Sequence, residues 1–458
     1  MPTSAAATSY GELFRIRSFP RLAGGVVLAR TASQMMQLAL VLFVLQRFNS
    51  PTLAGITVFL AIAPGIAMSP VAGALLDRHG RVRLITLDYL IGACSLFSLA
   101  GLDAVGRLPP AALLPIVAVS SLTYSLSNSG ARSLLPLIVP KQLWDRANAL
   151  DSIAYAVTIG AGPALAGTLT ALSSPRLALI ATAAVYVVAA ALMSGLREPV
   201  AKSRPGSILA EAWAGLGHVL VRNPTLRGVA LVVSLMNVGL GILVVAVPVL
   251  VFQRLHANAV LVGELWAIYG LASVPSALAF GRVNTEGRER TVMGLCALVA
   301  GLGVAVLSFG ATAWIVAGAM LIAGLANGPF DVSMFSLRQR RTDPAWFGRA
   351  FAVSMGVNWA GTPIGSGISG PLIHLGLPVA FAVAAGFVLF SAGLVRWVVP
   401  AETTGRIDGE SARQPRRDVP VEAKSELRRA GCRVTPGRGD PKESATENTQ
   451  PARKRRRR

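Results

Sequence analysis

Twelve long apolar runs, almost free of charged residues, constrain the fold of this chain more than any other feature. Each run has close to the roughly 20 residues that an α-helix needs to cross a bilayer. Only 14% of the residues are charged, whereas soluble domains contain about a quarter. The sequence therefore predicts an all-α membrane protein with twelve transmembrane helices. The predicted helices lie at residues 22–45, 53–76, 83–106, 110–138, 147–172, 176–196, 227–252, 259–283, 291–311, 313–337, 347–373 and 378–400.

Arginine and lysine are distributed unevenly between the predicted loops. The segment before the first run and the loops after the even-numbered runs carry most of them, among them Arg78, Arg146, Arg227 and Arg338. The loops after the odd-numbered runs carry only Arg47, Arg107, Arg176 and Arg254. Because short basic loops stay in the cytoplasm, we expect a multi-pass protein of the inner (plasma) membrane with both termini cytoplasmic.

The net charge of +21 follows from this loop bias and from the basic segment 401–458. It therefore gives no reason to expect a nucleic-acid partner. That segment is rich in charge, Pro, Gly and Ser and poor in apolar residues, which predicts a disordered cytoplasmic tail. Its last six residues are arginine or lysine, and contact with anionic lipid is the expected use of such a run.

The sequence repeats itself weakly with an offset close to 207 residues. Gln46-Arg47 matches Gln253-Arg254, and Gly80-Arg81 matches Gly287-Arg288. A nearly constant offset over half the chain predicts two pseudo-symmetric six-helix halves. The predicted parts are a cytoplasmic N-terminal segment at 1–21, a first bundle at 22–196, a linker at 197–226, a second bundle at 227–400 and the tail at 401–458. Apolar residues on one side of 207–222 predict an amphipathic linker helix on the inner membrane surface.

A tight basic turn separates the second and third runs: Gly73-Ala74-Leu75-Leu76-Asp77-Arg78-His79-Gly80-Arg81-Val82-Arg83. It resembles motif A of the major facilitator superfamily, whose members are two-half transporters with the substrate site between the halves. The resemblance implies a gating motif formed by Gly73, Asp77, Arg78, Gly80 and Arg81. Asp77 is expected to pair with a neighbouring arginine and hold helices together in one conformation. In the second copy Asn284 replaces the acid, which predicts an asymmetric lock. A generic basic loop is the alternative.

The fifth run contains Gly160-Ala161-Gly162-Pro163-Ala164-Leu165-Ala166-Gly167, which resembles motif C of antiporters in the same superfamily. Gly162, Pro163 and Gly167 are its candidate residues, although ordinary small-residue packing would look the same. Leu13-Phe14-Arg15, Phe19-Pro20-Arg21 and Asn223-Pro224-Thr225-Leu226-Arg227 extend the resemblance to the efflux branch that contains the enterobactin exporter and macrolide efflux proteins.

Polar residues inside the predicted spans are candidates for substrate binding, because burying them in hydrocarbon is costly. Arg30, Gln34 and Gln37 share one helical face of the first run, and the resemblance places that helix at the cavity. The full candidate set is Arg30, Gln34, Gln37, Tyr124, Asn128, Asn237 and Asn327. Hydrogen bonds between helices, without any substrate contact, are the alternative for each.

The acidic residues Asp331, Glu264 and Asp88 are candidates for proton coupling. We hypothesise that Arg30 and Asp331 pair when the cytoplasmic side is closed, and that protonation of Asp331 loosens this pair. Asp88 is expected to pair with a basic loop residue near motif A. Glu264 could accept a proton, contact a cationic substrate or serve the structure alone.

The sequence predicts a monomeric secondary transporter that exports an amphipathic small molecule, such as a drug, secondary metabolite or siderophore. Multidrug resistance by proton antiport with alternating access is the expected activity, without enzyme chemistry, cofactor or metal. An importer or a lysophospholipid flippase of the same fold is one alternative. A non-transporting membrane scaffold that uses the tail is another.

Overall fold

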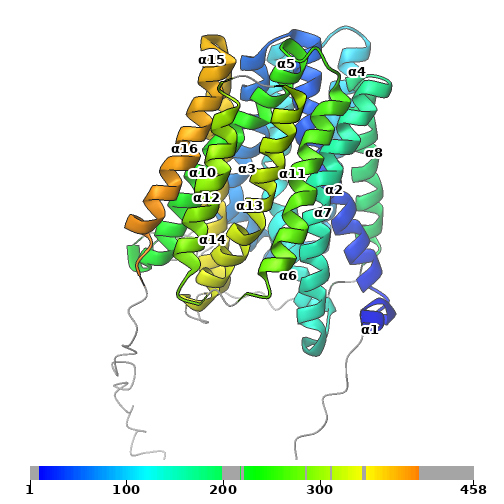
Figure 1. Cartoon of the computed structure of the whole chain (residues 1–458). Coiled ribbons are helices and arrows are strands. Elements are labelled where there is room, and N and C mark those ends of the chain that lie inside the picture. Colours follow the sequence, from blue (N-terminus) through cyan, green and yellow to red (C-terminus); the bar gives the residue numbers. More distant parts are fainter. Residues whose placement is uncertain are drawn as a thin grey trace, which may run out of the picture. The chain divides into compact units, whose positions relative to one another are not determined.

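The structure is a computed structural model that describes residues 10–196, 198, 217, 221–283, 286–309, 312–342 and 347–401. All regular structure within these residues is helical (Figure 1). The first half contains α1 (Tyr10–Arg15), α2 (Phe19–Phe48), α3 (Pro51–His79), α4 (Arg81–Ala104), α5 (Pro110–Ser121), α6 (Tyr124–Ile138), the 3₁₀ turn η1 (Lys141–Leu143), α7 (Trp144–Leu172) and α8 (Pro175–Ser194). The second half contains α10 (Pro224–Gln253), α11 (Ala259–Phe280), α12 (Glu289–Val306), α13 (Ala313–Arg340), α14 (Phe347–Trp359), α15 (Gly361–Leu375) and α16 (Leu377–Val398).

The predicted spans are present as helices, and two of them, the fourth and the eleventh, are each divided into two helices. Eleven helical segments of the described part are long and apolar enough to cross a membrane, and α5 and α6 together form one of them. The predicted eleventh run is instead divided between α14 and α15. They meet in a tight turn at Ala360, whose N–H donates to the carbonyl of Val357 at 3.2 Å. The predicted linker helix lies almost wholly outside the described residues, and the tail beyond Ala401 lies outside them.

Helix starts follow from short cap sequences. The side chains of Ser50, Ser174 and Asn223 each accept a hydrogen bond from the backbone N–H three residues later, and proline follows each of them. Such a cap satisfies an otherwise unpaired donor, and proline loses nothing at the first helical position. The turn between α3 and α4 consists of Gly80 at φ +88°, a backbone conformation that other residues adopt only with strain.

The two ends of the helix bundle differ in charge. We name the end with the Gly80 turn and the start of α12 the basic end, because Arg78, Arg81, Arg288 and Arg290 lie there. The other end, with the turn between α2 and α3, is the opposite end. At the opposite end a double ion pair ties three helices of the first half. Asp103 accepts from Arg47 Nε at 2.9 Å and lies 2.7 Å from the Arg176 guanidinium.

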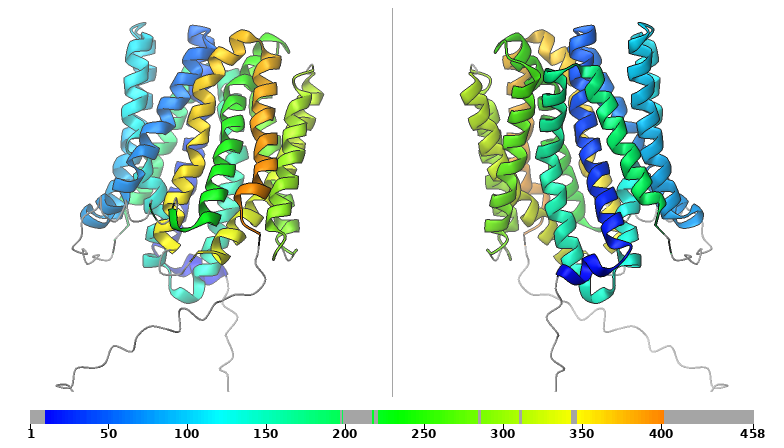
Figure 2. Two further views of the ribbon diagram at one scale, coloured as in Figure 1. Left: turned by 90° about the vertical axis from the view of Figure 1, so that its left-hand side faces the viewer. Right: turned by 90° about the vertical axis from the view of Figure 1, so that its right-hand side faces the viewer.

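The two halves meet through two helix pairs. The helix α7 packs along α11, and α3 packs along α15 (Figure 2). At the opposite end the backbones approach so closely that a Cβ on Gly55 of α3 would lie 2.2 Å from the carbonyl oxygen of Ser366 in α15. His374 Nε2 lies 3.1 Å from Thr52 Oγ1 between the same two helices. The opposite end is therefore closed.

Among the described side chains, the buried apolar clusters join the halves at the opposite end. One continuous cluster contains most of the first half and the opposite-end parts of α10, α11, α13 and α16. At the basic end the second half has a separate cluster that includes Val229, Met293 and Phe330. A further separate cluster around Leu13 and Val139 belongs to the first half. The halves therefore share a core at the opposite end and have their own cores at the basic end.

Candidate functional site

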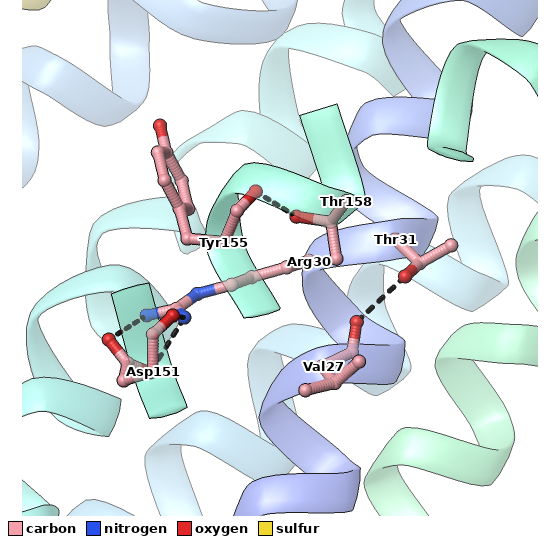
Figure 3. A network of polar contacts seen from close by, with 6 residues as sticks. All are labelled: Val27, Arg30, Thr31, Asp151, Tyr155 and Thr158. Atoms are coloured by element: carbon pink, nitrogen blue, oxygen red, sulfur yellow. Dashed lines mark hydrogen bonds and ion pairs between the residues drawn. The ribbon is translucent and has the colours of Figure 1, made fainter. Parts of the chain in front are cut away.

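An ion pair inside the first half is the best-defined polar feature of the bundle (Figure 3). Arg30 of α2 donates to Asp151 of α7 through Nη1 to Oδ1 at 2.6 Å and through Nη2 to Oδ2 at 3.1 Å. Nη1 also donates to the backbone carbonyl of Asp151 at 3.3 Å. The guanidinium lies 5.4 Å from the centre of the Tyr155 ring. Such two-pronged pairs are both strong and geometrically specific.

The hypothesised pair between Arg30 and Asp331 is not formed in this structure, because Asp151 binds Arg30. Asp331 of α13 accepts a hydrogen bond from Asn327 Nδ2, one turn earlier, at 3.0 Å. The hypothesis concerns a state closed at the cytoplasmic side, and for that state it stays a prediction. Sequence reasoning missed Asp151, although a charge within the predicted span at 147–172 was the signal that could have revealed it.

Tyr155 lies at the meeting point of the two halves. Its hydroxyl interacts electrostatically with Arg30 and Arg132 of the first half and with Asp331 of the second. Tyr269 of α11 interacts with both Asp331 and Tyr155. We define the central polar cluster as Arg30, Arg132, Asp151, Tyr155, Tyr269, Asn327 and Asp331. It combines two arginines, two acids and two aromatic rings, which suits a ligand with both polar and apolar parts.

The second half contains a related arrangement that holds helices together. Asn237 of α10 donates to the backbone carbonyl of Asn358 at 2.8 Å, with the same sequence separation of 121 residues as Arg30 and Asp151. Arg338 of α13 donates to Asn358 Oδ1 at 2.7 Å. Asn237 is therefore an inter-helix contact in this structure. Arg338, which the sequence analysis placed in a basic loop, is fully buried, so that expectation was wrong.

The remaining polar candidates are distributed around the cluster. Gln34 and Gln37 are half-buried on α2, and Tyr124 is half-buried at the start of α6. Asn128, one turn after Tyr124, is exposed. The hydroxyl of Tyr124 interacts with Ser33 and with the charges of Arg30 and Arg132. The face of α6 that carries these residues is therefore turned toward α2.

Asp88 of α4 is buried at 7% exposure and lies against the hydroxyls of Thr123 and Ser127. Together with Tyr124 and Tyr186 it lines a cavity of about 20 Å³, enough for one water molecule. No arginine or lysine of the described residues forms an ion pair with Asp88, so the expected partner near motif A was wrong. Two hydroxyl groups at the start of α6 hydrogen-bond the carboxyl group instead.

Glu264 of α11 lies apart from the other two acids. Its side chain is exposed, toward the opposite end from Tyr269 on the same helix. Within the described part of the chain it forms no ion pair. The structure therefore brings Asp331, but not Glu264, into the central polar cluster.

The basic turn is fastened by an acid that sequence reasoning missed. Arg81 Nη1 lies 3.2 Å from Glu198 Oε1, and Arg81 Nε donates to Ser133 Oγ at 3.1 Å. The backbone N–H of Val82 donates to Glu198 Oε2 at 3.1 Å. Glu198 follows α8, the last helix of the first half, so the pair joins the turn to the segment that ends this half. Gly80 forms the turn itself, and Arg78 is exposed.

Part of the predicted motif cannot be placed. Gly73 and the side chain of Asp77 lie outside the described residues, although the backbone there belongs to α3. Asn284 of the second copy also lies outside them. Near that copy Glu289 of α12, buried at 2% exposure, pairs with Arg340 of α13 at 2.5 Å. The second half thus also has an ion pair at its basic end, which joins α12 to α13, but its residues do not correspond to Arg81 and Glu198.

The antiporter-like motif lies where α7 meets its neighbours. A Cβ on Gly162 would lie 2.4 Å from Gln34 Cβ in α2, and one on Gly167 would lie 2.5 Å from the carbonyl oxygen of Ala259 in α11. The carbonyl of Pro163 lies close to Gly263 in α11. Gly162 therefore packs within the first half, whereas Pro163 and Gly167 pack against the second.

Comparisons with known proteins agree with this architecture. Residues 22–342 and 229–434 match the profile of the Major Facilitator Superfamily. An MFS-type transporter of Sinorhizobium fredii, y4rN, is 37% identical over 408 residues, which cover 86% of this chain and 98% of that protein. The enterobactin exporter EntS of Shigella boydii is 26% identical over 359 residues, which cover 77% of this chain and 83% of that one.

A solved structure with the same fold is that of the nucleoside transporter NupG. It superimposes with a TM-score of 0.66 at 15% identity and covers 84% of this chain and 100% of that one. At this identity the likeness concerns the fold. The predicted fold class and the resemblance to the superfamily are both confirmed. The chain belongs to the Major Facilitator Superfamily and is a multi-pass membrane transporter of small molecules.

Proposed function

We propose that this transporter exports an amphipathic small molecule, a drug, secondary metabolite or siderophore, in exchange for protons. The observation that carries the proposal is the central polar cluster, which joins an acid of the second half to arginines of the first across Tyr155. Charged groups inside a membrane bundle are expensive, and they usually mark a substrate or proton pathway. A site between the halves is also where alternating access can expose a ligand to either side.

The basic end is the cytoplasmic end in this proposal, because short basic loops stay in the cytoplasm. The structure is closed at the opposite end and has separate cores at the basic end. It corresponds to the state that takes up substrate from the cytoplasm. Export is further supported by the relative EntS, which is an enterobactin exporter.

Asp331 is the proposed principal proton carrier. Its hydrogen-bond partner here is the neutral amide of Asn327, and the cation that acts on it is Arg338 of the same helix. Arg30 is engaged with Asp151. Loss of the proton leaves a carboxylate that can attract Arg30 across the interface, which draws the basic ends together. Asp88, beside its water-sized cavity, and Glu264 are secondary candidates. The turn at Arg81, with Asp77, is proposed to stabilise the state that is closed at the cytoplasmic side.

Everted membrane vesicles from an efflux-deficient host test the proposal. The vesicles are acidified by respiration, and a panel of amphiphiles is added while a pH-sensitive dye reports proton release. Wild-type vesicles should release protons on addition of a substrate, and a protonophore should abolish substrate uptake. Asp331→Asn should remove the coupled signal, whereas Glu12→Gln, an exposed acid-to-amide control in α1, should leave it unchanged.

The alternatives give different results in the same host. An importer would raise the accumulation of its substrate in intact cells, and a lysophospholipid flippase would respond only to lysolipids. Full proton-driven transport by Asp331→Asn would refute the assigned role of Asp331. Absence of any transported amphiphile, with normal expression, would refute export of this class of molecule.

A further inference from the structure

We infer that Arg132 is an anion-recognition residue of the central polar cluster, so that the exported amphiphile carries an acidic group. The inference rests on the proposed function, because it assumes that the substrate occupies the space between the halves. It begins from three positions that the two halves share. These are Arg30 and Asn237 on α2 and α10, Asp151 and Asn358 on α7 and α14, and Arg132 and Arg338 on α6 and α13.

In the second half the three positions contact one another. Asn237 donates to the backbone carbonyl of Asn358 at 2.8 Å. The side-chain oxygen of Asn358 therefore accepts from Arg338, at 2.7 Å. Arg338 Nη1 also lies 2.9 Å from Met355 Sδ. The arginine is fully buried as a result. Its charge is used to hold α13 against α14.

In the first half the contact that corresponds to Arg338–Asn358 is not formed. Arg30 takes the backbone carbonyl of Asp151 and both of its carboxylate oxygens. Both carboxylate oxygens of Asp151, the residue that corresponds to Asn358, already accept from Arg30. Arg132 does not bind them, and its side chain is exposed. Within the described residues Arg132 forms no ion pair with an acid.

Arg132 faces the polar cluster rather than lipid. Tyr124, Asn128 and Arg132 are spaced by four residues and so share one face of α6. Arg132 interacts electrostatically with Tyr124 and with Tyr155 of α7. Gly130, on another face, packs against Ile85 of α4. The guanidinium is thus within electrostatic range of both tyrosine hydroxyls.

The exposed guanidinium of Arg132 lies within a span and has no ion-pair partner among the described acids. A carboxylate, sulfonate or phenolate of the substrate would supply a counter-charge through paired hydrogen bonds. The rings of Tyr124 and Tyr155 would contact the apolar part of the same molecule. An inside-negative membrane potential also drives an anion outward, so an acidic substrate agrees with the proposed direction.

Two dyes with a common xanthene ring test the inference on the purified full-length chain. Fluorescein is anionic, whereas rhodamine 123 is a cation without an acidic group. Fluorescence polarisation should give tighter binding of fluorescein to the wild type. Arg132→Gln should raise the Kd for fluorescein by about tenfold or more and leave that for rhodamine 123 within about twofold. Arg132→Lys should recover part of the loss, and Arg107→Gln, an exposed control at the opposite end, should change neither.

Several outcomes would overturn the inference. These are no binding of fluorescein to the wild type, an unchanged Kd in Arg132→Gln, or an equal loss for both dyes, which would indicate a structural role. Dye uptake into everted vesicles then separates this inference from the proposed function. Arg132-dependent binding without any transport would support the anion site and refute export. Export that is independent of Arg132 would refute the anion site alone.

Discussion

Replacing Asp151 by asparagine should destabilise the first half, because it removes the counter-charge of Arg30 while keeping the size of the side chain. The pair lies between the surface and the interior, with side chains that are 16% and 29% exposed. Breaking a fully buried pair costs about 3–5 kcal/mol, and an exposed pair contributes about 0.2–1 kcal/mol. We therefore expect Asp151→Asn to lower the free energy of unfolding by about 2 kcal/mol.

The second half suggests how the loss can be repaired. Asn237 and Asn358 form an uncharged contact at the corresponding positions. The double variant Arg30→Asn with Asp151→Asn imitates that contact and leaves no unpaired charge behind. It should therefore be more stable than Asp151→Asn alone, by about 1 kcal/mol, since replacing both partners costs less than removing one. The gain in stability is limited because the double variant also loses the packing of Arg30 on the Tyr155 ring.

The assay is a double-mutant cycle on the free energy of unfolding, measured by titrating the detergent-solubilised protein with a denaturing detergent and following helix content. Arg30→Asn, Asp151→Asn and the double variant are compared with the wild type, and Arg107→Gln is the control. A coupling energy near zero would refute the reasoning, because the two side chains would then contribute independently. So would a double variant less stable than both single variants.

Three further predictions concern other contacts. Glu198→Gln should weaken the fastening of the Arg81 turn and reduce transport several-fold at normal expression, measured as dye uptake into everted vesicles; unchanged uptake would argue against a gating role. Gly167→Val should disfavour closure at the opposite end, because its Cβ would meet the carbonyl of Ala259. In a cysteine-free background, Gly167→Val should increase labelling of a cysteine at Phe59 by a membrane-impermeant reagent; unchanged labelling would contradict the packing argument. Truncation after Pro400 should preserve transport in the same vesicle assay, whereas a scaffold that acts through its tail would lose its function.

The sequence was sufficient for the architecture because each run had to satisfy the same bilayer thickness. Run length and loop charge can be counted along the sequence without knowing any contact. The spans were therefore found even where the helix ends differ from the predicted bounds. The break at Ala360 was missed although Gly361 and Pro363 follow it, because glycine and proline also occur inside unbroken spans such as α7. Tight packing of α14 and α15 against α10, rather than a change in hydropathy, accompanies that break.

The partners of the charged residues were harder to predict. Helices that are apolar on nearly all sides give no periodic signal for their rotation, so the direction of a charge such as Arg30 or Arg338 cannot be read from spacing. Asp151 and Glu198 each bind an arginine from a helix far away in sequence. Only the folded bundle determines which of several acids an arginine meets. The repeat could have narrowed the choice, because Asn237 and Asn358 mark the positions that Arg30 and Asp151 occupy in the first half.

The close backbone contacts at the opposite end affect how tightly the transporter is sealed. Where Gly55 meets Ser366 and Gly167 meets Ala259, no long side chain lies between the helices that could swing aside. Helix surfaces that touch through their backbones separate only as whole bodies. A passage for protons or ions therefore cannot form by the motion of one residue. We therefore expect the opposite end to open to ions only when the two halves separate.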